Sequence, residues 1–214
     1  MKASTLHFEN SFIEAKKPSD KLMIVLHGRG DSIEPFTQFD QELGLENVNF
    51  LLLRAPRKFL DGFSWYGEPP YQKAGVLKIR SKILDVLREL EAQGWKSENI
   101  FLFGFSQGCL VSADVALNYP KKLAGVIGIS GYFHFFPRWQ KQLSEDTKQT
   151  PWLFTHGHRD DVLPLKETKF GAMKLKKAGF RVDWTELNKK HVLLEEEYPL
   201  IRQWVEDKLK DFKG

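Results

Sequence analysis

One serine of this sequence lies in a pattern that can expose a hydroxyl group for nucleophilic attack. Ser106 is the centre of Gly104-Phe105-Ser106-Gln107-Gly108, which fits the G-x-S-x-G pattern. An apolar run precedes the pattern and small, apolar residues follow it, so the serine lies where a predicted strand meets a predicted helix. Glycine on both sides permits the sharp turn that such a junction needs. A glycine-rich turn without catalytic function fits the same five residues, so other parts of the chain must decide.

A serine hydroxyl is a poor nucleophile near neutral pH, so it needs a histidine as base and a carboxylate that orients the histidine. When the nucleophile lies in such a strand-to-helix turn, the usual chain order is Ser, then Asp or Glu, then His. Four histidines follow the serine: His134, His156, His158 and His191. Only the last one follows the candidate acids and also lies between a predicted strand and the final predicted helix. We therefore predict His191 as the base, whereas spacing leaves Asp160 and Asp161 as alternatives for the acid.

A tetrahedral intermediate also needs two backbone N–H groups that stabilise its oxyanion. The residue after the serine, Gln107, supplies the first in this kind of site. The second comes from a loop after an earlier strand, and Leu26-His27-Gly28-Arg29-Gly30-Asp31 follows the first strong apolar run. Its glycines allow the backbone to approach a substrate oxygen closely. We therefore predict the backbone of Arg29 as the second donor.

Apolar runs of strand length alternate with longer stretches of helical periodicity, which is typical of an α/β fold with a mostly parallel sheet. The predicted strands are Leu22–Leu26, Phe50–Leu53, Ile100–Phe105, Ala124–Ile129, Pro151–His156 and Phe180–Leu187. The predicted helices are an amphipathic one over Val76–Leu90, then Ser106–Tyr119, Glu167–Ala178 and Glu195–Lys210. The length and the lack of repeats or linkers indicate a single domain over residues 1–214.

Two groups of aromatic residues lie near the predicted catalytic edge of the sheet. The first is Phe59, Phe63, Trp65 and Tyr66, in a segment from Arg54 to Tyr71 whose prolines and glycines predict a loop over the site. The second is Tyr132, Phe133, Phe135, Phe136 and Trp139. Any single aromatic residue could instead pack in the core. Together the two groups lead us to expect an apolar pocket for an acyl group.

Composition and charge exclude several functional classes. The net charge of +4 comes from 32 basic and 28 acidic residues mixed along the chain, so we expect no nucleic-acid partner. Residues 1–20 lack the continuous apolar region of a secretory signal, and no apolar run approaches the roughly 20 residues that span a bilayer. The single cysteine, Cys109, cannot form an internal disulfide. We expect a soluble, cytoplasmic protein without a transmembrane segment.

Taken together, the motifs resemble those of the acyl-protein thioesterase and phospholipase/carboxylesterase family of α/β hydrolases. The matching landmarks span nearly the whole chain: Leu26-His27-Gly28-Arg29-Gly30-Asp31, Gly62-Phe63-Ser64-Trp65-Tyr66, Gly104-Phe105-Ser106-Gln107-Gly108, His156-Gly157-x-x-Asp160 and His191. The resemblance implies an α/β-hydrolase fold with helices on both faces of the sheet, and it assigns the acid to Asp160. It also implies that Arg29 and Gln107 form the oxyanion hole and that Trp65, Tyr132 and Val162 border the acyl site. No metal or organic cofactor is implied.

Three basic residues depart from the family pattern. Members usually carry an apolar residue at the position of Arg29, and small or apolar residues at the positions of Lys189 and Lys190. These changes predict positive charge near the mouth of the site. We therefore expect a substrate with an apolar acyl group and a neutral or anionic leaving group.

The sequence thus predicts a serine hydrolase that cleaves carboxylic esters or thioesters through a Ser-His-Asp triad and an acyl-enzyme intermediate. The expected substrates are small-molecule or lipid esters and thioesters, with acylated proteins as a variant, and an apolar rim permits a homodimer. One alternative is a catalytically idle module that binds lipid or a protein partner on the same fold. Another, a dienelactone-hydrolase-like enzyme, predicts cysteine where Ser106 stands.

Overall fold

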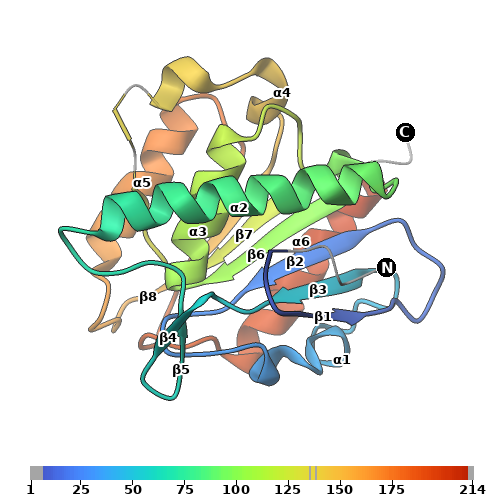
Figure 1. Ribbon diagram of the computed structural model, residues 1–214, viewed down its shortest axis with the longest axis horizontal. Helices are drawn as coiled ribbons and strands as arrows, with labels where there is room; N and C mark the ends of the chain where they lie inside the picture. Colours follow the sequence, from blue (N-terminus) through green and yellow to red (C-terminus); the bar gives the residue numbers. More distant parts are fainter. Residues whose placement is uncertain (1–6, 135, 138, 212–214) are drawn as a thin grey trace.

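A seven-stranded, mostly parallel sheet forms the centre of the molecule in a computed structural model that describes residues 7–134, 136, 137 and 139–211 (Figure 1). The strand order is β1-β3-β2-β6-β7-β8-β9, and only β1 runs antiparallel to its neighbour. The strands are β1 Asn10–Ile13, β2 Leu22–Leu26, β3 Asn49–Leu53, β6 Ile100–Phe105, β7 Gly125–Ile129, β8 Trp152–Gly157 and β9 Val182–Leu187. The helices are α1 Phe39–Leu43, α2 Gln72–Ala92, α3 Gln107–Asn118, α4 Glu145–Lys148, α5 Leu165–Lys177 and α6 Tyr198–Asp211.

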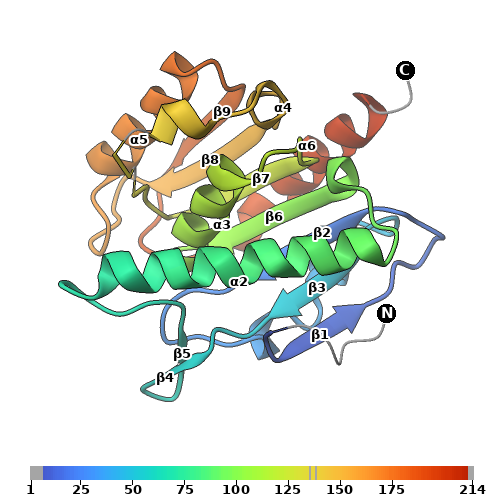
Figure 2. The same ribbon diagram turned by 45° about the horizontal axis from the view of Figure 1, so that its top comes forward.

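Helices cover both faces of this sheet, as the sequence predicted (Figure 2). Successive side chains of a strand point to opposite faces, so β2 contributes Leu22, Ile24 and Leu26 to one apolar cluster. Helices α2, α3 and α5 complete that cluster. The alternate residues Met23 and Val25 join a second cluster that α1 and α6 cover. Because both faces are buried, the central strands are apolar throughout, which made them recognisable in the sequence.

The six predicted strands agree with the structure to within two residues at each end, and the predicted helix over Val76–Leu90 lies inside α2. Short elements were missed, namely the helices α1 and α4 and three strands. Strand β1 is a four-residue edge strand, and its half-buried side chains give no apolar run. The predicted loop at 54–71 contains a hairpin of β4 (Arg57–Phe59) and β5 (Gly62–Ser64), whose three-residue strands are too short for a periodic signal.

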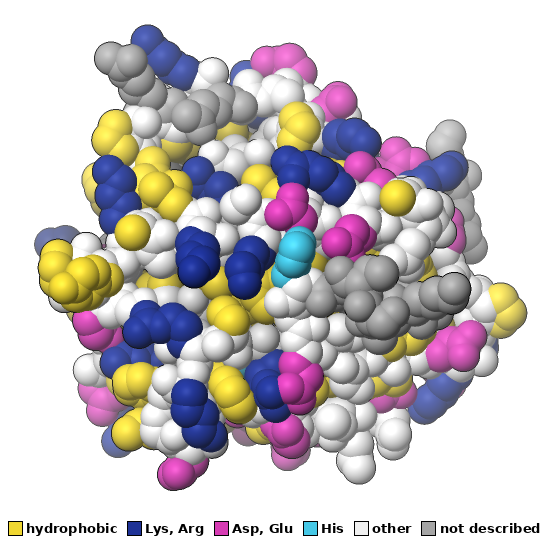
Figure 3. All heavy atoms as spheres, in the orientation of Figure 1, with side chains coloured by type: hydrophobic (Ala, Val, Ile, Leu, Met, Phe, Trp, Pro, Cys, Tyr) yellow, Lys and Arg dark blue, Asp and Glu magenta, His cyan; other side chains and the backbone are white. Residues whose placement is uncertain are grey.

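Basic and acidic side chains are interspersed over the face of the molecule that carries α2 (Figure 3). Among the described residues, this face shows no large area of one charge, in keeping with the mixed charges along the sequence. In the part of the chain that the structure describes, no helix is both long and apolar enough to cross a membrane.

Candidate active site

Ser106 occupies the turn between β6 and α3, at the carboxyl end of the central strand. Its backbone is in the left-handed region with φ of 51°, a strained conformation for a residue with a side chain. The flanking glycines also permit close packing. A Cβ atom on Gly104 would lie 2.3 Å from the carbonyl oxygen of Gly108, and one on Gly108 would lie 2.1 Å from that of Leu26. The G-x-S-x-G pattern therefore allows the first turn of α3 to pack directly on two strands.

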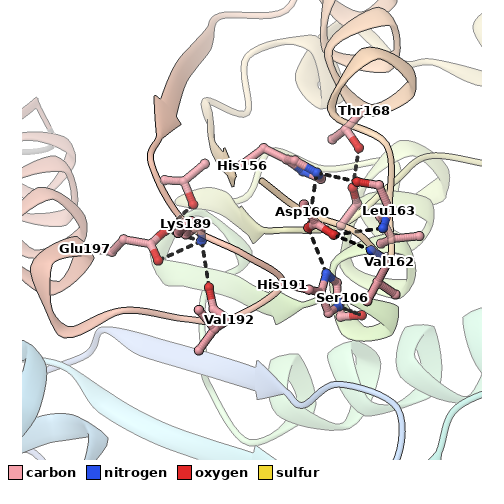
Figure 4. A network of polar contacts seen from close by, with 12 residues as sticks. Ser106, His156, Asp160, Val162, Leu163, Thr168, Lys189, His191, Val192 and Glu197 are labelled. Carbon is pink, nitrogen blue, oxygen red and sulfur yellow. Dashed lines mark hydrogen bonds and ion pairs between the residues drawn. The ribbon is translucent and has the colours of Figure 1, made fainter. Parts of the chain in front are cut away.

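The three residues proposed as a triad are hydrogen-bonded in series (Figure 4). Nε2 of His191 lies 2.8 Å from Oγ of Ser106, and Nδ1 of His191 lies 2.8 Å from Oδ2 of Asp160. A carboxylate can only accept, so the proton of a neutral imidazole is on Nδ1, and Nε2 accepts from the serine hydroxyl. This is the tautomer that a general base needs.

Of the two alternative acids, the structure places Asp160 against the histidine. Its side chain is fully buried, whereas Asp161 is exposed. Burial alone would raise the pKa of Asp160, but the N–H groups of Leu163 and Val162 both donate to Oδ1, and His191 donates to Oδ2. These hydrogen bonds outweigh the burial, so the pKa of Asp160 is held below its ordinary value of 3.8. The carboxylate is therefore kept charged and fixed in orientation.

His156 is a further contact of this carboxylate, and no function was predicted for it. Its Nε2 lies 2.9 Å from the carbonyl oxygen of Leu163 and 3.3 Å from Oδ2 of Asp160. Burial lowers the pKa of His156, which favours the neutral ring with its proton on Nε2. His156 thus orients the acid and the loop after β8, and its place in the H-G-x-x-D motif was the available signal.

The two predicted oxyanion donors belong to residues that line a cavity together with Ser106. The backbone amides of Arg29 and Gln107 donate to no acceptor among the described residues, and both residues line the same cavity as Ser106. Gln107 begins α3, so its amide is among those that a helix leaves without an internal partner. Available N–H groups beside the serine are what an oxyanion hole requires.

Trp65 is buried and does not line this cavity, which corrects its expected position beside the acyl group. Its indole N–H donates to the carbonyl oxygen of His27, 2.8 Å away, and its backbone amide donates to Oε1 of Gln107. Nε2 of Gln107 in turn donates to the carbonyl oxygen of Tyr66. Trp65 therefore holds the segment before α2 against the loop after β2 and against the start of α3.

The cavity beside Ser106 has a volume of about 380 Å³, and Tyr132 and Val162 do line it. It is less apolar than we expected from the aromatic content of the neighbouring segments. Most described members of the two aromatic groups pack on the core or beneath guanidinium groups, as Phe133 does against Phe154 and Phe63 beneath Arg54. Phe135 lies outside the described residues. Polar side chains, including Tyr66, Glu68 and Gln72, supply much of the lining instead.

Lys189 does not carry positive charge to the mouth of the site, in contrast to our expectation. Its side chain is fully buried, and Nζ donates to both carboxylate oxygens of Glu197 and to the carbonyl oxygen of Val192 (Figure 4). Glu197, at the end of a short 3-10 helix (η5, Glu195–Glu197), also accepts from Thr155 and from the backbone of Leu194. Burial lowers the pKa of Lys189, against the opposing effect of Glu197. This network fastens the loop that carries the histidine to β8 and to the start of α6.

Arg29 does lie at the cavity, but its charge is paired. The guanidinium group forms an ion pair with Glu68 and lies 4.1 Å from the ring centre of Phe59. Both charged side chains are partly exposed. Of the three predicted charges, only Lys190 is exposed and has no ion-pair partner within the described residues.

Comparison with known proteins identifies the family of this chain. A sequence profile of the phospholipase/carboxylesterase family matches residues 9–208, which is nearly the whole chain. The chain belongs to this family. It is the family that the motifs indicated. The protein is accordingly a serine hydrolase with an α/β-hydrolase fold.

Individual relatives of this family member include carboxylesterases and thioesterases. Carboxylesterase SOBER1 from Arabidopsis thaliana is 31% identical over 205 residues, covering 86% of this chain and 89% of the relative. Its crystal structure superimposes with a TM-score of 0.82, covering 90% of this chain and all of that chain. Acyl-protein thioesterase 1 from Yarrowia lipolytica is 27% identical, and the match covers 93% of this chain and 96% of the relative. A probable carboxylesterase from Oryza sativa subsp. japonica is 31% identical over 142 residues, and that match spans 53% of its length.

Proposed function

We propose that this family member cleaves carboxylic esters or thioesters through a triad of Ser106, His191 and Asp160. The observation that carries the proposal is the unbroken series of hydrogen bonds from Oγ of the serine to the buried carboxylate, at the wall of a cavity. The backbone N–H groups of Arg29 and Gln107 would form the oxyanion hole.

The reaction follows from this arrangement. Nε2 of His191 takes the proton from Ser106 as Oγ attacks the carbonyl carbon, and the two backbone N–H groups stabilise the resulting oxyanion. His191 then donates that proton to the departing alcohol or thiol, which leaves an acyl group on the serine. A water molecule, deprotonated by the same histidine, releases the acid and restores the hydroxyl group. The charged carboxylate of Asp160 stabilises the imidazolium ion in both halves of the reaction.

The substrate range is proposed from the relatives. Both carboxylesterases and acyl-protein thioesterases are similar to this chain over most of their length, so we propose small-molecule or lipid esters and thioesters as substrates. Acylated proteins extend the same chemistry. No metal ion or organic cofactor is required by the proposed steps.

Hydrolysis of p-nitrophenyl esters and matched thioesters of graded acyl length tests the proposal. We expect Ser106→Ala and His191→Ala to lower kcat by about 10⁴-fold or more, because triad members act as a unit. His158→Ala, an exposed histidine of the same region, is the matched control and should retain activity. An inactive wild type that is folded would instead favour the idle binding module.

The acid is tested by a second matched pair. Asp160→Asn removes the carboxylate that contacts the imidazole, whereas Asp161→Asn changes the exposed neighbour. We expect a loss of about 10⁴-fold in kcat for the first variant, because the amide favours the wrong tautomer of the histidine. Equal activities of the two variants would remove Asp160 from the proposed triad.

A further inference from the structure

Two tyrosine hydroxyl groups meet in the cavity beside Ser106. The hydroxyl oxygens of Tyr66 and Tyr132 are 2.7 Å apart, and Nε2 of Gln72 donates to that of Tyr132 over 2.8 Å. All three residues line the cavity that holds the serine. Tyr66 is almost fully buried, with 2% of its surface exposed. Tyr132 is half-buried, so the hydroxyl pair forms part of the cavity wall.

Counting hydrogens shows that this pair has one donor to spare. Each phenol carries one hydrogen, and only one of the two hydrogens can lie between the two oxygens. Gln72 supplies a hydrogen and cannot accept through its nitrogen. No other acceptor for either hydroxyl group is present among the residues that the structure describes. Whichever tyrosine donates to the other, one O–H group remains available to a group inside the cavity.

The two phenols stay protonated under the conditions in which an esterase works. Burial raises the pKa of Tyr66 well above its ordinary value, and it also raises the pKa of Tyr132. The spare donor is therefore present throughout the neutral and mildly alkaline range. A donor that a bound substrate shields from water needs an acceptor, so a bound group without an acceptor atom is disfavoured at this position.

The tyrosine pair is connected rigidly to the proposed oxyanion hole. Gln107 accepts from the amide of Trp65 and donates to the carbonyl oxygen of Tyr66, with distances of 2.7 and 3.0 Å. A substrate carbonyl placed between Ser106 and the amide of Gln107 thus has a fixed position relative to the spare O–H group. Whichever substituent of that carbonyl extends into this cavity therefore contacts the hydroxyl pair.

A second groove gives the leaving group a separate place. His191 also lines a hollow of about 280 Å³ whose wall includes Phe36, Phe105 and Leu193, but not Ser106 or the oxyanion donors. The leaving group receives its proton from this histidine. Asp31 and Glu42 also line this groove, so it suits an uncharged alcohol or thiol better than an anionic one, and the acyl group then occupies the cavity with the tyrosines.

We propose that the cavity selects acyl groups that carry a hydrogen-bond acceptor, such as an ether, hydroxyl or carbonyl oxygen, and that Tyr66 and Tyr132 recognise this oxygen. The inference rests on the proposed function, because it assigns the cavity to the acyl side of an ester. It replaces the purely apolar acyl group that the sequence led us to expect.

The test compares ether-containing acyl groups with hydrocarbon groups of the same length. The probes are p-nitrophenyl methoxyacetate, 3-methoxypropanoate and 4-methoxybutanoate, paired with the butanoate, pentanoate and hexanoate. An ether oxygen only accepts, and it replaces one methylene without lengthening the chain. Each kcat/KM is divided by the rate constant of hydroxide-catalysed hydrolysis, which removes the intrinsic reactivity of the ester. We expect a corrected preference for the ether of about 2- to 10-fold at one chain length, the range of a neutral hydrogen bond.

Variants assign this preference to the hydroxyl pair. In Tyr66→Phe/Tyr132→Phe both hydroxyl groups are absent, and we expect the ether-to-hydrocarbon ratio to fall to about one or below. Tyr119→Phe is the matched control, since that buried tyrosine donates to Glu91 and does not line the cavity. It should keep the wild-type ratio.

Three outcomes separate this inference from the proposed function. A wild type that hydrolyses both series with a corrected ratio near one at all three lengths overturns the inference and leaves the esterase intact. A preference that survives in the folded double variant also overturns it. Failure of the wild type to hydrolyse any probe overturns the proposed function instead. The wild-type ratios decide the matter by themselves if the double variant does not fold.

Discussion

Two loops flank the candidate nucleophile, and each contains a basic residue paired with a glutamate, but the two pairs differ in their environment. On the loop after β9, Lys189 and Glu197 are both completely buried. On the loop after β2, Arg29 pairs with Glu68 from the segment before α2, and the two side chains are 37% and 63% exposed. The same chemical interaction therefore has different consequences. The buried pair fixes the backbone that presents the histidine, whereas solvent screens the exposed pair and leaves it little influence on stability.

The largest effect is expected when the buried pair is broken. Lys189→Met leaves the carboxylate of Glu197 buried without its cation, which costs about 3–5 kcal/mol in the free energy of unfolding. Lys190→Met, at the exposed neighbouring lysine, is the matched control and should change stability by less than about 0.5 kcal/mol. Urea denaturation of both variants measures the difference. A similar stability for the two variants would show that the buried pair has no special importance.

Removing the charges of both Lys189 and Glu197 should separate the effect of this pair on stability from its effect on the position of His191. In Lys189→Met/Glu197→Gln the amide oxygen can still accept from Leu194, so we expect the unfolding free energy to return to within about 2 kcal/mol of the wild type. The carbonyl of Val192 loses the Nζ donor, however, and the loop with His191 becomes less restrained. We expect kcat to fall about 10-fold with little change in KM, because a small displacement of the base is costly. Full recovery of kcat would show that the pair does not position the histidine.

The buried carboxylate of Asp160 should make the stability of the protein depend on pH. The folded state holds the pKa of Asp160 below 3.8, so the carboxylate stabilises the fold above that pH and loses its contribution as the pH falls through the folded value. We expect Asp160→Asn to be less stable than the wild type by about 1–3 kcal/mol at pH 7. The difference should shrink below about pH 4. Asp161→Asn should show neither the loss nor its pH dependence.

The smallest effect is expected at the exposed pair. Glu68→Gln should change the unfolding free energy by less than about 1 kcal/mol. It leaves the Arg29 charge uncompensated at the cavity that we assign to the acyl group, so hydrolysis of an ester with an anionic acyl group should increase about 2- to 5-fold relative to its cationic counterpart. Raising the salt concentration to 1 M should abolish the change, because the Debye length falls to about 3 Å. A selectivity that does not respond to salt would contradict this interpretation.

The outline of the fold could be predicted because its strands are buried on both faces. Strands such as β6 and β7 are apolar at nearly every position, and the helices between them show a clear period. The edge strand β1 and the hairpin of β4 and β5 lack that signal. Their backbone pairs with residues far along the chain, as Asn10 does with Leu53 and Phe63 with Asp31. Such pairing depends on the assembled sheet and not on local composition.

The residues proposed to act on the substrate carbonyl were recognisable because their order and turns are local properties of the chain. The G-x-S-x-G turn needs small residues beside Ser106, and the position of His191 follows from the order of strands at one edge of a parallel sheet. The sequence alone therefore determined the nucleophile candidate, the base candidate and the edge at which they meet. Spacing left Asp160 and Asp161 as equivalent neighbours, and the family resemblance assigned the acid to Asp160.

Tertiary structure decided the environment of each polar group. Burial and hydrogen bonding distinguish Asp160 from Asp161, place Trp65 in the core, and turn Lys189 from an expected surface charge into part of the support for the histidine. The same holds for the cavity, where aromatic residues pack their rings inward and present hydroxyl groups to the site. Residue type gives the chemistry that a side chain can perform, but solvent exposure and partners depend on contacts between distant segments, which only the folded chain creates.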